Sequence, residues 1–241
     1  MQRIRIAELS KSFGPTRALR SVSIDLDAGS VHTILGENGS GKSTLIKALS
    51  GVVAPDAGGI AIDGAEVRLP NPRAAQALGI HTVFQEILTA PNRSLVDNVH
   101  LGFHPWLRRR TSPAEQTRRT RELFASLGIP EVDVTAEAGE VPLYVQQVTV
   151  IARALLRQPR LLILDEATAA LGLSERRALF EVIRGLRAAG VAVVFVSHRL
   201  DEVVEISDTI TVLRSGRVVG QVDRAGASAA VLLGLMAPDA A

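Results

Sequence analysis

The sequence contains no cysteine, which excludes a disulfide framework and any metal site built on thiolates, and which fits a reducing compartment. Its formal net charge is only +2, too small to indicate a nucleic-acid partner by itself. Long apolar runs are also missing, since stretches such as 191–196 are far shorter than a bilayer span. Residues 1–9 alternate and contain two arginines, so we expect no signal peptide there. Any membrane role is therefore expected to be peripheral.

What the sequence does contain is typical of a soluble globular protein with a sizeable core. Its 241 residues are 46% hydrophobic and 22% charged. Residues 36–44, Gly-Glu-Asn-Gly-Ser-Gly-Lys-Ser-Thr, match the phosphate-binding pattern G-x-x-x-x-G-K-[ST] at every fixed position. The apolar run 31–35 predicts a strand leading into this loop, and 45–49 predicts a helix leaving it. The alternative is an ordinary glycine-rich turn, but the full match in this context favours a nucleoside triphosphate site.

The chemistry of this loop suits phosphate. Glycines let backbone N–H groups approach the phosphate oxygens, and the N-terminus of the following helix adds unpaired N–H groups and partial positive charge. Lys42 is expected to bridge the β- and γ-phosphates, and the Ser43 hydroxyl to bind Mg²⁺. The predicted ATP-binding residues of the loop are Gly36, Glu37, Asn38, Gly39, Ser40, Gly41, Lys42, Ser43 and Thr44. Phe13, in a turn-like segment, could stack on a base or equally cover the core of a strand.

The rest of the chain alternates strands and helices around a helical insertion. Strands are predicted near the N-terminus (Ile4 to Leu9, Val22 to Leu26), in a short hairpin through Ile60, Ile62 and Val67, and at 82–84, 161–164, 192–196, 209–213 and 217–222. Helices are predicted at 95–101, 113–127, 146–156, 175–189 and around 231–236. This order predicts an α/β fold with a mostly parallel sheet and antiparallel strands at the N-terminus.

A strongly basic run lies within the helical insertion, between Trp106 and Arg121. Such a run usually forms a solvated helical face, and the alternative is a docking surface for an acidic partner or lipid head groups.

Three polar side chains follow the ends of apolar strands, as the phosphate loop also does. Asp165 and Glu166 come directly after the strand at 161–164, and His198 follows the strand at 192–196. Ligands of parallel α/β sheets lie beyond the carboxyl ends of the strands, so we expect these groups to share one site. Asp165 would hold Mg²⁺ beside Ser43, Glu166 would polarise the attacking water, and His198 would contact the γ-phosphate. Helix capping is the alternative role for each.

On the basis of these residues, the chain resembles the nucleotide-binding subunits of ABC transporters over essentially its whole length. Within that family it most resembles the N-terminal half of the duplicated ATP-binding proteins of carbohydrate importers, the group that includes ribose, xylose and galactose importers. The stretches that carry the resemblance are residues 36–45, Val83-Phe84-Gln85-Glu86, Leu161 to Thr168, and Val196 to Val203. The resemblance implies a P-loop ATPase fold forming a single domain over 1–241, with a core of 1–86 and 158–241 and a helical subdomain at about 87–157.

The same resemblance implies further roles and partners. Gln85 would be a mobile glutamine that senses Mg²⁺ and the transmembrane partner, and Phe13 would occupy the adenine-stacking position. The helical subdomain would contact transmembrane permease subunits, and a second nucleotide-binding domain would close against this one. The cofactors would be ATP and Mg²⁺, the place of work would be the cytoplasmic face of the cell membrane, and no nucleic-acid partner is expected.

One departure from the family pattern bears on mechanism. The family carries a signature, Leu-Ser-x-Gly-Gln, whose serine and glycine contact ATP bound on the opposite subunit. Alignment on residues 151–154 places Pro142 at the serine and Tyr144 at the glycine. A hydroxyl and a backbone N–H are then lost, and a ring blocks close approach of the backbone. Ala167 and Gly172 are two smaller departures.

These features together predict an ATP-hydrolysing subunit of an ABC importer, with a sugar as the expected cargo. A soluble ABC-type ATPase without a transporter is the first alternative, although the long linker insertions usual for that class are absent. A regulatory module with little turnover is the second alternative, although Lys42 and Glu166 are both present.

Overall fold

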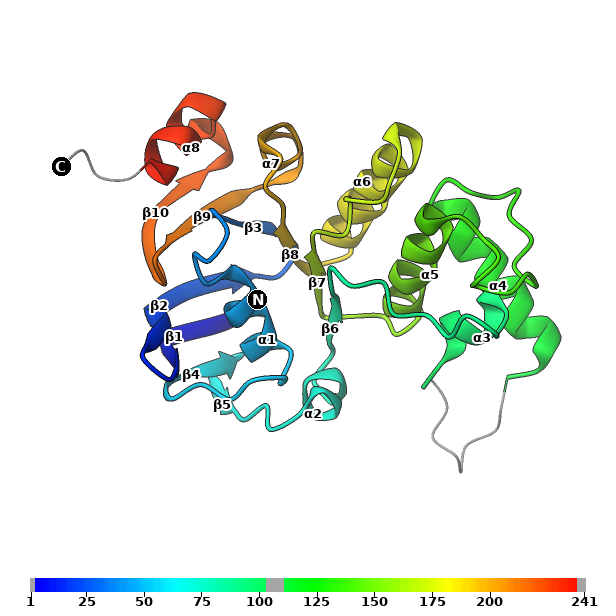
Figure 1. Cartoon of the computed structure of the whole chain (residues 1–241), viewed down its shortest axis with the longest axis horizontal. Helices are drawn as coiled ribbons and strands as arrows, with labels where there is room; N and C mark the ends of the chain where they lie inside the picture. Colours follow the sequence, from blue (N-terminus) through cyan, green and yellow to red (C-terminus); the bar gives the residue numbers. More distant parts are fainter. Residues whose placement is uncertain (1–2, 103–110, 238–241) are drawn as a thin grey trace. The chain divides into compact units, whose positions relative to one another are not determined.

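The computed structural model describes residues 3–102 and 111–237, and its secondary structure is drawn in Figure 1. The chain divides into two compact units, which we describe separately. The first unit comprises Met1–Thr82, Arg160–Glu166 and Leu186–Ala241, and the second comprises Val83–Pro159 and Ala167–Gly185. The first unit thus contains residues from both sides of the helical insertion, whereas Ala167–Gly185 group with the insertion.

An antiparallel sheet lies at the start of the first unit. Its strands, in the order β2-β1-β4-β5, are β2 (Thr16–Asp27), β1 (Arg3–Phe13), β4 (Ala57–Ile62) and β5 (Ala65–Val67). Alternate residues such as Ile4 and Ile6 are buried, as a strand with one covered face requires. The predicted N-terminal strands and short hairpin are confirmed. Phe13 differs slightly from the prediction, because it ends β1 and pairs with Thr16 across the turn.

A second, six-stranded sheet carries the strand ends of interest. Its strands, in the order β10-β9-β3-β8-β7-β6, are β10 (Arg217–Asp223), β9 (Thr209–Arg214), β3 (Val31–Leu35), β8 (Ala192–Val196), β7 (Leu161–Asp165) and β6 (Ile80–Val83). β3 pairs in parallel with β8 and β9, and β7 pairs in parallel with β8. Every residue of β3, β7 and β8 is buried, which explains why these strands are mostly apolar; the exceptions are His32 and Thr33 on β3 and Asp165 at the end of β7.

The last two strands of this sheet form an antiparallel hairpin. Ser215 and Gly216 both have positive φ, +49° and +77°, as a tight hairpin turn requires. The predicted mostly parallel α/β sheet is confirmed, and the structure adds an antiparallel strand pair at one edge of it.

The helices of the first unit follow the strands that position them. They are α1 (Lys42–Leu49), α2 (Pro72–Ala77), α7 (Leu200–Ile206) and α8 (Ala229–Met236), with a short 3₁₀ turn at Arg224–Gly226. α7 and α8 pack on β3 and β9 through a buried apolar cluster of Leu35, Val203, Ile210, Val212 and Leu232 (Figure 1). α1 begins at Lys42, so the lysine of the phosphate loop lies in the first turn of the helix.

The second unit is mainly helical. Its helices are α3 (Leu95–His100), α4 (Pro113–Ser126), α5 (Leu143–Leu155) and most of α6 (Leu173–Ala188). The predicted helices are confirmed, but α5 begins three residues before the predicted start. Pro142 occupies its N-cap with φ of −55°, an angle that proline adopts without strain.

The basic run can be followed only in part, because residues 103–110 lie outside the described residues. On α4, Arg118 and Arg119 both pair with Glu115, at 2.8 and 2.7 Å. These neutralising pairs support a solvated helical face. Of the helices within 3–102 and 111–237, none combines the length and hydrophobicity needed to cross a bilayer.

Candidate active site

The loop between β3 and α1 has the backbone that its glycines predict. Gly41 has a φ of +109°, and a Cβ there would come within 2.5 Å of the Ala18 carbonyl oxygen. A Cβ on Gly36 would clash with the backbone of Leu213 and the side chain of Ser40. Only glycine fits at these two positions, so the loop keeps the close backbone path that phosphate binding needs.

This loop is tied to the hairpin between β9 and β10. The Gly216 N–H donates to the Ser40 carbonyl oxygen at 2.9 Å, and the Arg20 N–H donates to the Gly216 carbonyl oxygen at 2.7 Å. The Ser40 hydroxyl is buried and has no hydrogen-bond partner among the described residues. A buried hydroxyl without a partner is costly, and a phosphate oxygen would satisfy it. The loop therefore fits a phosphate group.

Lys42 is the cation of the site and is almost fully buried. Its Nζ donates to the carbonyl oxygens of Gly36 and Glu37, at 2.7 and 2.9 Å. Burial lowers the pKa of Lys42, and the nearby carboxylates of Glu166 and Asp165 oppose this shift. The ammonium thus lies within the loop and in the field of both acids, so phosphate oxygens could replace the carbonyls as its acceptors.

The two acids stand at the end of β7. Asp165 is its last residue and is only 8% exposed; burial, followed by repulsion from Glu166, raises its pKa, while Lys42 and Lys47 oppose the shift. Glu166 has a φ of +49°, unusual for a non-glycine residue, and its N–H donates to the Val196 carbonyl oxygen at 3.0 Å. Backbone strain of this kind is concentrated at functional sites.

His198 approaches these acids from the end of β8. Its Nδ1 lies 3.5 Å from Oε1 of Glu166, and its side chain is 65% exposed. The structure thus brings Lys42, Asp165, Glu166 and His198 together at neighbouring strand ends, as the parallel-sheet argument predicts.

The other predicted site residues have simpler surroundings. Ser43 is exposed in the first turn of α1, Thr44 is half-buried beside it, and Glu37, Asn38 and Gly39 are exposed at the tip of the loop. Phe13 is 49% exposed, with the Lys11 ammonium 5.6 Å from its ring centroid. An exposed ring suits stacking on a base.

Gln85 is exposed at a bend, two residues after the end of β6, and belongs to the second unit. Its predicted role in sensing Mg²⁺ and the transmembrane partner stays a prediction.

The altered signature lies at the start of α5. Pro142 is the N-cap, no side chain caps the helix, and no acidic residue occupies its first turn. Leu143 is 59% exposed and Tyr144 is half-buried. This helix end therefore presents apolar side chains where the family pattern has a hydroxyl and a glycine.

Sequence reasoning missed one acidic residue near the site. Glu202, on α7, is buried and accepts a hydrogen bond from the Ser197 hydroxyl at 2.9 Å. An acid in the first turn of a helix is ordinarily solvated, so only its spacing from His198 could have pointed to it.

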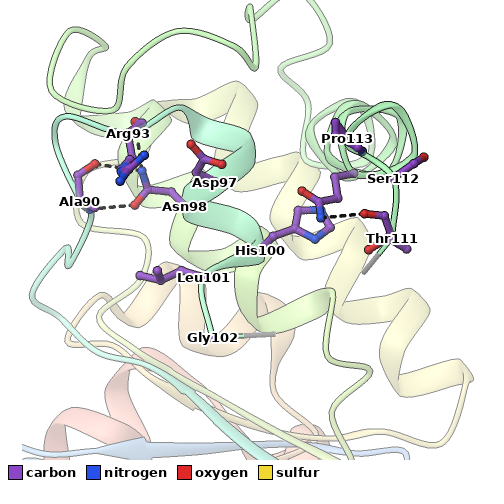
Figure 2. A pocket seen from close by; sticks show the side chains of 11 residues that line it. Ala90, Arg93, Asp97, Asn98, His100, Leu101, Gly102, Thr111, Ser112 and Pro113 are labelled. Atoms are coloured by element: carbon purple, nitrogen blue, oxygen red, sulfur yellow. Dashed lines mark hydrogen bonds between the residues drawn. The ribbon is translucent and has the colours of Figure 1, made fainter. Parts of the chain in front are cut away.

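A separate hollow lies in the helical unit, between α3 and the start of α4 (Figure 2). Asn98 anchors one wall: its amide donates to the Ala90 carbonyl oxygen at 3.0 Å and accepts from the Ala90 N–H at 2.7 Å. On another wall the Gln116 amide donates to the Thr111 carbonyl oxygen at 3.2 Å. Both amides are thus partnered by backbone groups within eight residues of them, so they fix the chain that leads into α3 and into α4.

The fold and the loop define a protein of the P-loop nucleotide-binding class, and comparison with known proteins specifies the family. The family model described as ABC transporter matches residues 19–169. The chain therefore belongs to the ABC transporter family, in agreement with the resemblance drawn from its motifs.

Curated relatives narrow the similarity to sugar importers. The chain is 43% identical over 217 residues to the ribose import ATP-binding protein RbsA 3 of Rhizobium meliloti, covering 90% of the chain and 42% of that protein. It is 37% identical to a putative ribose/galactose/methyl galactoside import ATP-binding protein of Agrobacterium fabrum, covering 97% of the chain and 46% of the relative. The chain thus spans less than half the length of these relatives.

Solved structures support the fold. An ATP-binding cassette of an ABC transporter in its ADP conformation superposes with a TM-score of 0.82 at 24% identity, covering 98% of each chain. A dimeric bacterial ABC transporter cassette gives 0.83 at 23% identity, covering 92% of this chain and 98% of the other. The predicted ABC-type ATPase fold is confirmed.

Proposed function

We propose that this chain binds and hydrolyses ATP to power an ABC importer for a sugar. The observation that carries the proposal is the convergence in one unit of the phosphate loop, the buried Lys42, the acids Asp165 and Glu166, and His198 3.5 Å from Glu166. A phosphoryl-transfer site needs a phosphate cradle, a cation, a metal-holding acid and a group that orients water, and each has a candidate here.

The proposed roles in binding follow from the geometry of the loop. Two features support phosphate binding: the backbone path through Gly36 and Gly41, and the Ser40 hydroxyl, which has no partner in the described part of the chain. Lys42 would contact the β- and γ-phosphates. The Ser43 hydroxyl and the Asp165 carboxylate offer oxygen ligands of the kind that Mg²⁺ prefers, with Gln85 as the further ligand that the resemblance implies. Mg²⁺ would supply neutralisation of the phosphate charge. Phe13 would stack on the adenine.

The proposed roles in hydrolysis fall to two residues. Glu166 would accept a proton from the attacking water, and its partial burial beside Asp165 supports a carboxylate held for chemistry rather than for solvation. His198 would contact the γ-phosphate and hold Glu166 in place. A regulatory module without turnover is less well supported, because the cation Lys42 and the candidate base Glu166 are both present.

The cargo and the partners rest on the relatives. Several of them are named as ribose import ATP-binding proteins, and one as an importer of ribose, galactose or methyl galactoside. We therefore infer that the cargo is a sugar. We also infer that this chain corresponds to the N-terminal half of these relatives. Transmembrane permease subunits would dock on the helical unit, where Leu88 and Leu101 are 62% and 54% exposed. A second nucleotide-binding domain would complete the machine at the cytoplasmic face of the membrane.

The proposal is tested by adding the chain to vesicles that hold the permease and the second ATP-binding domain. We expect Mg-ATP turnover that rises when the transported sugar is added, and co-purification of the chain with the permease. ATP turnover without any permease association would favour the soluble ATPase, and ATP binding without turnover in the assembled complex would favour the regulatory module.

A further inference from the structure

The turn that carries His198 is held on both sides by one buried carboxylate. Glu202 on α7 is only 2% exposed. Its Oε2 accepts a hydrogen bond from the Ser197 hydroxyl at 2.9 Å, and its Oε1 lies 3.1 Å from Nε of Arg199. The residues before and after His198 are therefore both attached to the same side chain.

The Ser197 hydroxyl closes this arrangement. It donates to Glu202 and accepts from the Arg199 N–H at 3.1 Å, so the backbone on both sides of His198 belongs to one small hydrogen-bonded ring. Ser197 is also 2% exposed. A buried carboxylate is tolerated when its oxygens are partnered, and both oxygens of Glu202 have partners here. The network therefore connects Glu202 on α7 to the turn that carries His198.

The His198 ring itself is held much less firmly. It is 65% exposed, and the polar contact that the structure gives it is the 3.5 Å approach of Nδ1 to Glu166. The position of the ring is then determined mainly by the backbone that carries it. Misplacement of a reacting group by about 1 Å can lower a rate about 100-fold.

We propose that Glu202 is a positioning residue for hydrolysis, acting through Ser197 and Arg199 to hold His198 against Glu166. The proposal rests on the proposed ATPase function for its catalytic part. Glu202 would touch neither the nucleotide nor the water, so ATP affinity would not depend on it. A purely structural Glu202, which only stabilises α7, would leave His198 in place in the folded protein.

The chain offers a matched pair of variants. Glu202→Gln keeps the size of the side chain and one acceptor for Ser197 but removes the charge that faces Arg199. Asp201→Asn is the control, because Asp201 also lies 3.7 Å from the Arg199 guanidinium but is 71% exposed at its side chain. Both lie in the first turn of α7, so any general effect of removing an acid there is shared.

The first measurement is the imidazole NMR spectrum of histidine-labelled chain, assigned with His198→Ala. We expect the His198 signals to shift or broaden in Glu202→Gln and to stay unchanged in Asp201→Asn. An unchanged His198 signal in a Glu202→Gln protein that melts cooperatively would overturn the proposal. If Glu202→Gln does not fold, Ser197→Ala removes only a hydroxyl and carries the same expectation.

The second measurement is turnover in the assembled transporter. We expect Glu202→Gln to lower kcat about 10- to 100-fold with an unchanged KM for ATP, and to have no further effect when His198→Ala is already present. An equal loss with and without His198 would show a role that does not pass through it. Absence of turnover in the parent would count against the proposed function, whereas the NMR experiment would still test the positioning.

Discussion

Two helices of this chain begin where ABC ATPases present a helix N-terminus to phosphate, and the two beginnings are built differently. α1 begins after a glycine-rich loop, with a buried lysine at its first position and, beside it, the Ser40 hydroxyl, for which residues 3–102 and 111–237 supply no hydrogen-bond partner. α5 begins at Pro142, with the exposed Leu143 and the ring of Tyr144 in its first turn. Neither helix has a side-chain cap or an acidic residue in its first turn.

The comparison separates what any helix N-terminus offers to phosphate from what the phosphate loop adds. Both helices offer unpaired N–H groups and the same dipole. Only α1 adds close backbone approach and a charged donor. We propose that a chain with one competent end and one altered end works in an assembly with a single ATP site, in which this chain would supply the loop and a partner would supply the signature.

The largest expected effect comes from removing the charge at the α1 end. Lys42→Ala should abolish ATP binding at micromolar nucleotide, because a buried direct contact between ammonium and phosphate is lost. Fluorescence or calorimetric titration with Mg-ATP measures this. Lys47→Ala, on the exposed face of the same helix, is the control for loss of a lysine and should lose much less affinity than Lys42→Ala. Equal ATP affinity in the two variants would show that Lys42 has no special role at the start of α1.

The next largest effect distinguishes ATP binding at the phosphate loop from ATP hydrolysis. Glu166→Gln keeps the size of the side chain but cannot accept a proton, so hydrolysis should fall by about 10² to 10⁴ while ATP binding persists. Single-turnover hydrolysis in the assembled transporter, with nucleotide binding measured in parallel, tests this. Loss of binding with intact folding would instead assign Glu166 a structural role.

The altered α5 end can be repaired. In a Glu166→Gln background, Pro142→Ser with Tyr144→Gly should create an ATP-dependent homodimer, whereas the Glu166→Gln chain alone stays monomeric. Two restored contacts of about 1.5–3 kcal/mol each, or roughly 3–6 kcal/mol per interface, favour the closed dimer. Size-exclusion chromatography with Mg-ATP measures the change, and Tyr144→Phe serves as control. A stable dimer of the unrepaired chain would contradict the inference that its signature is inactive.

The smallest expected effect is a pH dependence of stability that arises from β3, the strand that leads into the phosphate loop and α1. Burial lowers the pKa of His32, on β3, to about 4, although Asp27 and Asp25 oppose the shift. The unfolded chain, with a histidine pKa of about 6.5, binds the proton more readily, so stability is lost as the pH falls from 6.5 towards 4. At pH 5.5 the loss is about 1 kcal/mol.

Chemical unfolding of the first unit between pH 7 and 5 measures this slope. His32→Gln can keep a hydrogen bond to Thr211, which Nε2 of His32 meets at 2.8 Å, and should lose the pH dependence. A slope unchanged by the substitution would assign the acid sensitivity to other groups.

Local motifs and sheet rules predicted most of the fold and the centre of the candidate site. The loop at 36–44 could be predicted because a short pattern contains its whole chemistry, and Asp165, Glu166 and His198 because parallel strands end at the same edge of a sheet. The left-handed backbone of Glu166 could not be predicted, since the residue type does not favour it.

Other features needed the tertiary structure. The buried role of Glu202 was hidden because an acid near the start of an amphipathic helix ordinarily faces water. The early start of α5 was missed because Leu143, Tyr144 and Val145 show no helical alternation, and Pro142 determines where the helix begins.

The hydrogen bond between Gly216 and Ser40 has a consequence for how mutations at the surface are interpreted. A hairpin tip normally tolerates substitution and insertion, because little depends on its shape. Here the tip is a wall of the nucleotide loop, and its two left-handed residues keep that wall in place before any ligand arrives. A residue inserted between Ser215 and Gly216 would therefore distort the phosphate loop, although the hairpin and the loop lie far apart in the sequence.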